Sequence, residues 1–163
     1  MENDLYNLAA KVGEFLKHHK LTLATAESCT GGLIAATITD VPGSSHYFDR
    51  GFVTYSNAAK IEMLGVREST LETHGAVSLE TAREMAEGVL GQSYANVSLS
   101  VTGVAGPSGG TKEKPVGTVC FAWCIACIPT KTSMMLFTGD RTAIRIQAVQ
   151  FALESLLQFS SLL

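Results

Sequence analysis

Apolar side chains recur every three or four positions in three parts of the chain, which is the spacing of an amphipathic helix. The first stretch starts near Asn3 and ends at the polar run 17–20. Its apolar members are Leu5, Leu8, Ala9, Val12, Phe15 and Leu16. The second stretch follows Ser78, a residue type that commonly caps helices, and the third covers about 142–157. The pattern therefore predicts three amphipathic helices.

Shorter apolar runs bounded by turn residues predict strands between these helices. We expect the strands at 21–26, 51–55, 97–102, 116–126 and 132–137. Two further helices are expected, one at 33–39 and one that starts at Ser56 and closes at Gly65. Because strands and helices alternate first and a hairpin follows, the order predicts a three-layer α/β/α sandwich with a mixed, mostly parallel sheet.

Length and composition favour one globular domain over residues 1–163. Hydrophobic residues make up 46% of the chain and charged residues 17%, which is typical of a chain that can form a core. The net charge is −3 and no basic stripe is visible, so we expect no nucleic-acid partner. No apolar run approaches the roughly 20 residues of a membrane span, and the start lacks the order of a signal peptide. We therefore expect a cytoplasmic protein without a membrane partner.

The four cysteines raise the question of a metal site. Cys120, Cys124 and Cys127 form a C-x3-C-x2-C pattern, but no histidine stands at a recognisable ligand spacing from another metal-binding residue. We interpret these cysteines as small buried thiols on a strand. No metal and no cofactor are expected.

Ligands of open α/β sheets bind beyond the carboxyl ends of the strands, so the segments after Ala26, Tyr55 and Thr102 are the places to search. In the first of them, 27–32, Gly31 and Gly32 allow a ligand to approach the backbone. The start of the next helix favours an anion or a carbonyl oxygen. The segment matches neither a Walker A loop nor G-x-G-x-x-G, and the glycines are equally consistent with a simple tight turn.

The second segment holds a candidate for covalent catalysis. A serine hydroxyl needs a base, and a desolvated lysine, often helped by a tyrosine, is the usual substitute for histidine. Ser45 precedes the strand that Tyr55 ends, and Lys60 lies on the first turns of the next helix. The Tyr-x4-Lys spacing differs from the Tyr-x3-Lys of short-chain dehydrogenases, which makes a nicotinamide-dependent oxidoreductase a weak competitor. A solvated helix lysine is the alternative reading of Lys60.

The third segment, 100–110, ends a strand in glycines and suits backbone recognition of a polar ligand, although an ordinary surface loop has the same composition. Further on, Arg141 and Arg145 are four residues apart and share a helix face. Paired guanidinium groups suit a phosphate, and two separate salt bridges are the alternative.

Four blocks of the sequence together resemble the CinA C-terminal family. They are TAESCTGG at 25–32, GSSHYFDRGFVTYSNAAK at 43–60, SVTGVAGPSGGTKEKPVGTV at 100–119 and GDRTAIR at 139–145. Members that stand alone deamidate nicotinamide mononucleotide to nicotinic acid mononucleotide and ammonia, and the resemblance implies this activity here. Longer members carry an additional N-terminal domain with pyrophosphatase activity, which we expect to be absent.

The resemblance also implies roles for individual residues. Ser45 would attack the carboxamide carbon, Lys60 would act as base, and Tyr55 would relay or position the proton. Substrate-binding residues would be Ser28, Thr30, Gly31, Gly32, Thr102, Gly103, Gly106, Arg141 and Arg145. We expect a homo-oligomer, a dimer or larger. The alternative is a non-catalytic module that binds a ligand or a partner and is associated with competence and DNA damage. Release of ammonia from nicotinamide mononucleotide by the protein would exclude this alternative.

Overall fold

The computed structural model describes residues 2–159 and contains one five-stranded sheet with the strand order β2-β1-β3-β4-β5. Strands β1 (Leu23–Glu27), β2 (Phe48–Val53) and β3 (Val97–Gly103) run parallel. Strands β4 (Thr118–Ile125) and β5 (Lys131–Leu136) each run antiparallel to the strand before them. The prediction of a mixed sheet is confirmed. Met1 and residues 160–163 of the predicted domain lie outside the described residues.

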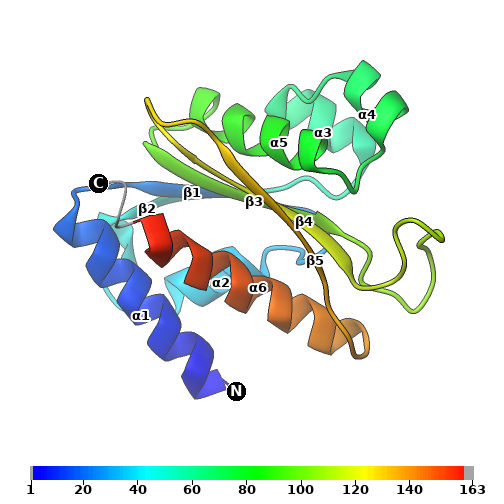
Figure 1. Ribbon diagram of the computed structural model, residues 1–163. Coiled ribbons are helices and arrows are strands. Elements are labelled where there is room, and N and C mark those ends of the chain that lie inside the picture. Colours follow the sequence, from blue (N-terminus) through cyan, green and yellow to red (C-terminus); the bar gives the residue numbers. More distant parts are fainter. Residues whose placement is uncertain (1, 160–163) are drawn as a thin grey trace.

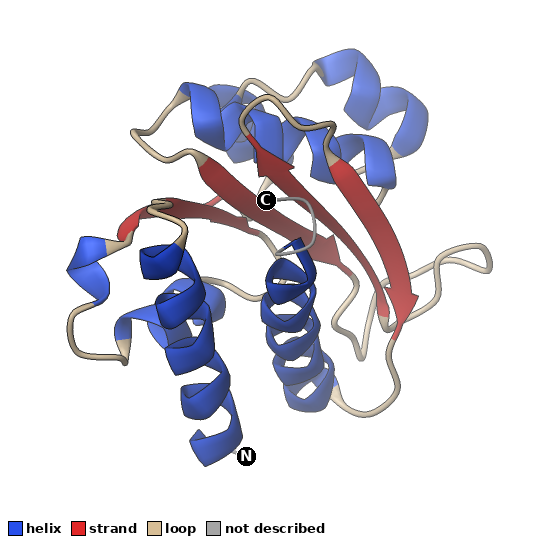
Figure 2. Ribbon diagram, turned by 60° about the vertical axis from the view of Figure 1, so that its left-hand side comes forward, coloured by secondary structure: helices blue, strands red, loops and turns tan. Residues whose placement is uncertain are grey.

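Helices cover both faces of the sheet. Helices α1 (Glu2–His18), α2 (Leu33–Thr39) and α6 (Arg141–Gln158) lie on one face. Helices α3 (Asn57–Leu64), α4 (Glu68–His74) and α5 (Leu79–Gly91) lie on the other (Figures 1 and 2). This arrangement confirms the predicted three-layer sandwich.

Large side chains fill the space between the sheet and helix α6. Phe121 and Trp123 stack at 5.8 Å between ring centroids, and the indole N–H of Trp123 donates to the carbonyl of Ala152 at 3.0 Å. That bond satisfies a polar group that is only 1% exposed. This side of the sheet holds the larger part of the hydrophobic core.

Small side chains line the opposite face, where helix α5 crosses strands β3 and β4. The cluster there consists of Ala82, Ala86, Cys120, Ala122 and Cys124. Because these side chains are short, the hydroxyls of Ser98 and Ser100 reach the helix itself and donate to the carbonyls of Ala86 and Ala82, each at 2.6 Å. The helix is therefore fixed to the sheet by polar as well as apolar contacts.

Two elements differ from the prediction. Helix α4 was not predicted, because Leu71 is its one buried large apolar residue and a single such residue sets no periodicity. Strand β2 runs from Phe48 to Val53 rather than over 51–55, so Tyr55 follows the strand instead of ending it. Its start lacks an apolar run because it is an edge strand whose Asp49 and Arg50 pair with each other at 2.9 Å. A short 3-10 helix, Ser44–His46, precedes it.

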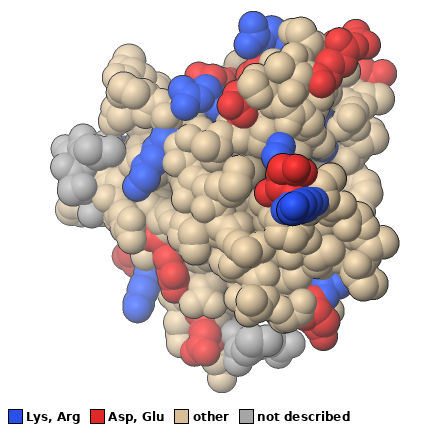
Figure 3. Space-filling view, turned by 45° about the vertical axis from the view of Figure 1, so that its right-hand side comes forward, with Lys and Arg blue, Asp and Glu red and all other residues tan. Residues whose placement is uncertain are grey.

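Three of the four cysteines are buried, as expected. Cys29, Cys120 and Cys124 are buried free thiols, whereas Cys127 is exposed at a positive φ of 68°, so its predicted burial is wrong. Residues 2–159 contain no group of three or more metal-ligating side chains and no helix long and apolar enough to cross a membrane. On the face drawn in Figure 3, basic and acidic side chains are interspersed.

Helix α5 approaches helix α3 closely only because residue 88 is a glycine. A Cβ at Gly88 would collide with the carbonyl oxygen of Leu64, whereas one at Gly91, in the same helix, would meet nothing within 4 Å. We expect Gly88→Ala to lower the free energy of unfolding by about 1–3 kcal/mol, because the helices must move apart. Gly91→Ala should leave it unchanged or raise it by up to about 1 kcal/mol. Urea denaturation of both variants checks this, and equal stabilities would contradict the packing described.

Candidate active site

The three segments singled out in the sequence meet in one pocket of about 180 Å³ at the carboxyl ends of β1, β2 and β3. Its lining residues are Ser28, Cys29, Tyr55, Lys60, Ala76, Val77, Thr102, Gly103, Ala105 and Arg141. Parallel strands end at the same edge of a sheet, so the loops after them converge there. A wall from the α4–α5 connection completes the pocket.

Lys60 is the most unusual residue of the pocket, because its side chain is only 1% exposed. Its Nζ lies 2.9 Å from the carbonyl oxygen of Thr54, 3.1 Å from that of Tyr55 and 3.1 Å from Oγ of Ser28. Residues 2–159 offer it no carboxylate within ion-pair distance. Burial lowers the pKa of Lys60 below its ordinary value, because the charged ammonium form loses its water. The alternative reading of a solvated lysine is wrong.

Ser28 is held in place by the strand that it follows. Its N–H donates to the carbonyl of Val101 at 3.0 Å, which extends the pairing of β1 with β3 by one residue. The chain then turns through Gly31 and Gly32, whose φ values of 59° and 102° are accessible to glycine without strain, into helix α2. Strand, tight turn and helix thus present the Ser28 hydroxyl at the edge of the sheet, as a nucleophile elbow does.

The carboxylate of Glu27 binds N–H groups at the start of helix α2. Glu27, only 1% exposed, accepts hydrogen bonds from the Thr30 hydroxyl at 2.6 Å and from the N–H groups of Ile34 at 2.8 Å and Ala35 at 3.0 Å. The N–H groups of Ile34 and Ala35 are therefore not free to bind a substrate anion, whereas the expected role of the turn in holding an oxyanion stays a prediction. Thr30, Gly31 and Gly32 shape the turn and do not line the pocket.

The two arginines have different surroundings. Arg145 donates from Nε to the carbonyl of Cys29 and from Nη2 to that of Thr30, each at 3.1 Å, and so holds the turn from outside the pocket. Arg141 lines the pocket, where its Nη1 donates to the carbonyl of Gly106 at 2.8 Å. Neither arginine forms an ion pair within residues 2–159, so the expected alternative of two salt bridges is wrong.

Ser45 lies far from this pocket. It is an exposed residue of the 3-10 helix that precedes β2, whereas Lys60 follows the other end of that strand. The six residues of β2 separate the two ends by roughly 20 Å at about 3.3 Å per residue. The expected contact between Ser45 and Lys60 is therefore wrong, and Ser28 occupies the place next to the lysine. The sequence carried the signal for Ser28, because it directly follows a buried strand and precedes two glycines and a helix.

Tyr55 and Thr102 both line the pocket, with different parts engaged. The backbone oxygen of Tyr55 accepts from Lys60 and from the Ser28 hydroxyl. The residue as a whole is 62% exposed, and its own hydroxyl accepts a hydrogen bond from Nη2 of Arg141 at 3.4 Å. The Thr102 hydroxyl donates to the carbonyl of Ala76 at 2.9 Å.

Burial raises the pKa of the neighbouring Cys29 thiol to about 12, which keeps it protonated and unreactive.

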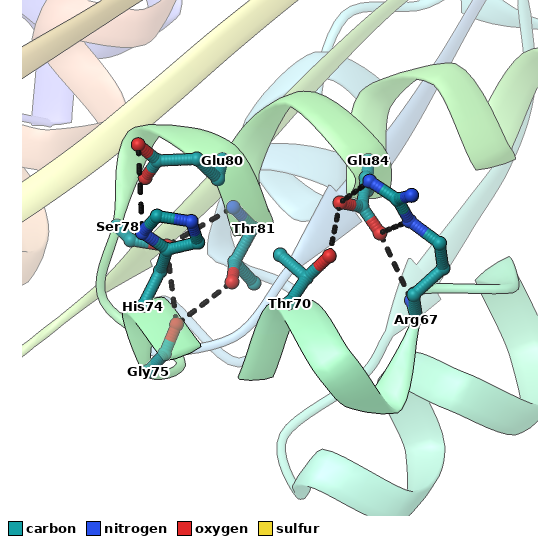
Figure 4. Close-up of polar contacts among 8 residues, drawn as sticks. All are labelled: Arg67, Thr70, His74, Gly75, Ser78, Glu80, Thr81 and Glu84. Carbon is teal, nitrogen blue, oxygen red and sulfur yellow. Dashed lines mark hydrogen bonds and ion pairs between the residues drawn. The ribbon is translucent and has the colours of Figure 1, made fainter. Parts of the chain in front are cut away.

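The wall formed by Ala76 and Val77 is anchored to helix α5. Ser78 and Thr81 both donate their hydroxyls to the carbonyl of Gly75, at 3.1 and 2.7 Å (Figure 4). Further along the same helix, Glu84 binds Arg67 and Thr70 and so fixes helix α4, as Figure 4 also shows. The pocket wall is therefore part of the α4–α5 unit rather than a free loop.

The fold and the site define an α/β protein with a buried lysine against a serine at the edge of its sheet. The family model of the CinA C-terminal domain matches residues 5–160, and the chain belongs to this family. It is 54% identical over 157 residues, 96% of each chain, to the nicotinamide-nucleotide amidohydrolase PncC of Enterobacter agglomerans. Identity to the PncC of Escherichia coli strain K12 is 52%, over 96% of this chain and 95% of the relative.

A solved structure has the same fold as this chain. The crystal structure of the competence/damage inducible protein CihA from Agrobacterium tumefaciens superposes with a TM-score of 0.93. The two sequences are 47% identical, and the match covers 96% of both chains.

Proposed function

We propose that this protein hydrolyses the carboxamide of nicotinamide mononucleotide to nicotinic acid mononucleotide and ammonia, with Ser28 as nucleophile and Lys60 as base. The contact of 3.1 Å between Nζ of the buried Lys60 and Oγ of Ser28 is the observation that carries this proposal. Identity above 50% to nicotinamide-nucleotide amidohydrolases over nearly the whole chain supports the choice of substrate.

Nζ of Lys60 contacts three acceptors, the carbonyls of Thr54 and Tyr55 and Oγ of Ser28. The Ser28 hydroxyl in turn donates to the carbonyl of Tyr55 at 3.4 Å. In the neutral amine the two N–H groups can stay on the two carbonyls, and the lone pair is then free to accept the hydroxyl proton of Ser28. The lowered pKa of Lys60 favours this form, and a lysine in it is the base that a serine nucleophile needs.

The reaction then follows in two halves. Oγ of Ser28 attacks the carboxamide carbon while its proton passes to Lys60, and the protonated lysine gives that proton to the departing nitrogen, which leaves as ammonia. The remaining acyl ester on Ser28 is cleaved by water, whose proton Lys60 takes and returns to the serine oxygen. The acid is released and both residues regain their initial state.

Tyr55 serves this reaction as a hydrogen-bond donor. Its hydroxyl oxygen accepts from Arg141, which leaves its own proton available for the carbonyl oxygen of the substrate. A donor at this oxygen stabilises the negative charge that develops during the attack. The ring hydroxyl does not contact Lys60, so a proton relay through it is not part of the proposal.

The phosphate of the substrate is expected beside Arg141. The start of helix α2 is filled by Glu27, and Arg145 is committed to the carbonyls of the turn. Arg141 borders both the catalytic pocket and a neighbouring hollow of about 510 Å³, which Ala105 and Gly139 also line. A nucleotide with its ring at Ser28 would extend past Arg141 into this hollow.

The sequence-based expectations of a cytoplasmic location and of a homo-oligomer stay predictions. Light scattering on the purified protein measures its oligomeric state directly.

The first test concerns the identity of the nucleophile. Ser28→Ala should reduce the rate of ammonia release from nicotinamide mononucleotide by a factor on the order of 10³ or more, because no other hydroxyl is within reach of Lys60 in residues 2–159. Ser45→Ala, the matched control, should keep full activity. Circular dichroism verifies that both variants are folded. The reverse outcome, a dead Ser45→Ala beside an active Ser28→Ala, would overturn the assignment.

The second test concerns the base. Lys60→Arg should be almost inactive although it keeps the positive charge, because a guanidinium stays protonated at all relevant pH values. In the unmodified enzyme, kcat/KM should rise with pH as the Lys60–Ser28 pair loses its proton, since only the neutral amine can accept the serine proton. Steady-state kinetics over a pH series measure both effects. Substantial activity of Lys60→Arg would show that the lysine acts only through its charge.

The third test concerns the phosphate. Arg141→Ala should raise KM for nicotinamide mononucleotide on the order of tenfold or more, with a smaller change in kcat, because a charge-assisted contact to the phosphate is lost. Arg50→Ala is the matched control, since Arg50 pairs with Asp49 at the other end of the sheet. An unchanged KM in Arg141→Ala would place the phosphate elsewhere.

A further inference from the structure

The connection between β3 and β4, residues 104–117, is the longest stretch without helix or strand in the described part of the chain. It projects from the body of the molecule as the yellow-green loop in Figure 1. Three of its residues, Ala105, Pro107 and Val116, line the hollow into which the nucleotide would extend. A long loop beside a binding site commonly serves that site. The 104–117 loop thus forms one side of the proposed nucleotide site.

This loop is folded back on itself. Near its tip, the N–H of Thr111 donates to the carbonyl of Lys114 at 2.9 Å, and the N–H of Lys114 donates to the Thr111 hydroxyl at 3.0 Å. Closer to its base, Gly106 lies so near to Val116 that a Cβ at position 106 would collide with the valine side chain. The two sides of the loop therefore pack together and hold it as one unit.

Two side-chain hydrogen bonds attach this unit to the helices on the two faces of the sheet. Arg141 of α6, on one face, donates to the carbonyl of Gly106 at 2.8 Å. Nζ of Lys114 donates to the carbonyl of His74, the last residue of α4 on the other face, also at 2.8 Å. A lysine often binds a carbonyl at the end of a helix in this way. Lys114 thus joins the loop to the α4–α5 unit, which carries the opposite wall of the pocket.

The catalytic pair does not depend on this attachment. Ser28 is held by its backbone hydrogen bond to Val101 of β3. Lys60 is held by the carbonyls of Thr54 and Tyr55. Release of Lys114 from α4 would therefore change the surroundings of the nucleotide and leave the reacting groups in place.

We propose that Lys114 is a positioning residue for the nucleotide part of the substrate, because it fastens the 104–117 loop in the place where it shapes the hollow. This inference rests on the proposed function and deepens it. Lys114 acts through Pro107 and Val116, which line the hollow, and needs no contact of its own with the phosphate. A loop that is ordered before the nucleotide arrives lowers the entropic cost of binding.

Lys112 provides a matched control. It lies two residues earlier in the same loop, carries the same charge, and is exposed without an ion pair to any carboxylate of residues 2–159. Lys112→Met therefore removes one positive charge from the loop without releasing it from α4. Lys114→Arg is the conservative variant, because a guanidinium also donates hydrogen bonds to a carbonyl.

Steady-state kinetics measure the effect on the substrate. We expect Lys114→Met to raise KM for nicotinamide mononucleotide roughly fivefold or more while kcat changes less than about twofold, because the loop is released but the catalytic pair is not. Lys114→Arg should restore most of the lost affinity, and Lys112→Met should keep the original KM. An unchanged KM in Lys114→Met would overturn the proposal. So would an equal rise of KM in Lys112→Met, which would point to charge alone, or a loss of kcat as large as the rise of KM.

Hydrogen exchange followed by mass spectrometry tests the attachment in the absence of substrate. Amides of the 104–117 loop should exchange several times faster in Lys114→Met than in the unmodified protein, and at an unchanged rate in Lys112→Met, because local opening of the loop becomes easier. Equal exchange in all three proteins would overturn the proposal. Failure of the proposed function is a separate result: it would appear as absence of ammonia release by the unmodified enzyme, whereas the exchange measurement requires neither turnover nor ligand.

Discussion

Everything in the candidate site depends on the burial of one amine. Lys60 contacts two backbone carbonyls and one hydroxyl, and no carboxylate of residues 2–159 pairs with it. An ammonium ion is costly to keep in such a place, and loss of its proton relieves the cost. The same burial that makes the charged form unfavourable therefore produces the base that a serine nucleophile requires.

The rest of the fold keeps this arrangement in place. Glu27 fills the start of helix α2 and Arg145 holds the carbonyls of the turn, so Ser28 is fixed from both sides. Small residues let helix α5 lie close to β3 and β4, and helix α5 in turn carries the wall at Ala76. Glu27 and Arg145 thus shape the turn from outside the pocket. The pocket itself combines hydroxyl-bearing residues, small apolar residues and the two cations Lys60 and Arg141.

The sequence predicted the layers of the fold and the convergence of three loops, because helical periodicity, buried strands and glycine turns are local signals. It did not predict helix α4, which has too few apolar residues to show a period. For the site, Lys60 and Tyr55 were correctly placed at one cleft, but the serine was not. Ser45 and Ser28 both lie near the relevant segments in the sequence, and only the parallel pairing of β1 with β2 and β3 places Ser28 at the same edge as Lys60. The local pattern of a buried strand, two glycines and a helix marks the turn that holds Ser28, but its contact with Lys60 depends on pairing between residues that are distant in the chain. Likewise, Arg141 and Arg145 look equivalent in the sequence, and only their hydrogen-bond partners in the structure show that they have different roles.

The protonation state of Lys60 is the most direct measure of this account. Nuclear magnetic resonance of the lysine side chains, with the Lys60 signal assigned by its loss in Lys60→Met, follows the titration of each amine with pH. We expect Lys60 to lose its proton at a pH well below the value of about 10.4 that is ordinary for lysine. A Lys60 amine that stays protonated up to the ordinary range would contradict its role as the base for Ser28.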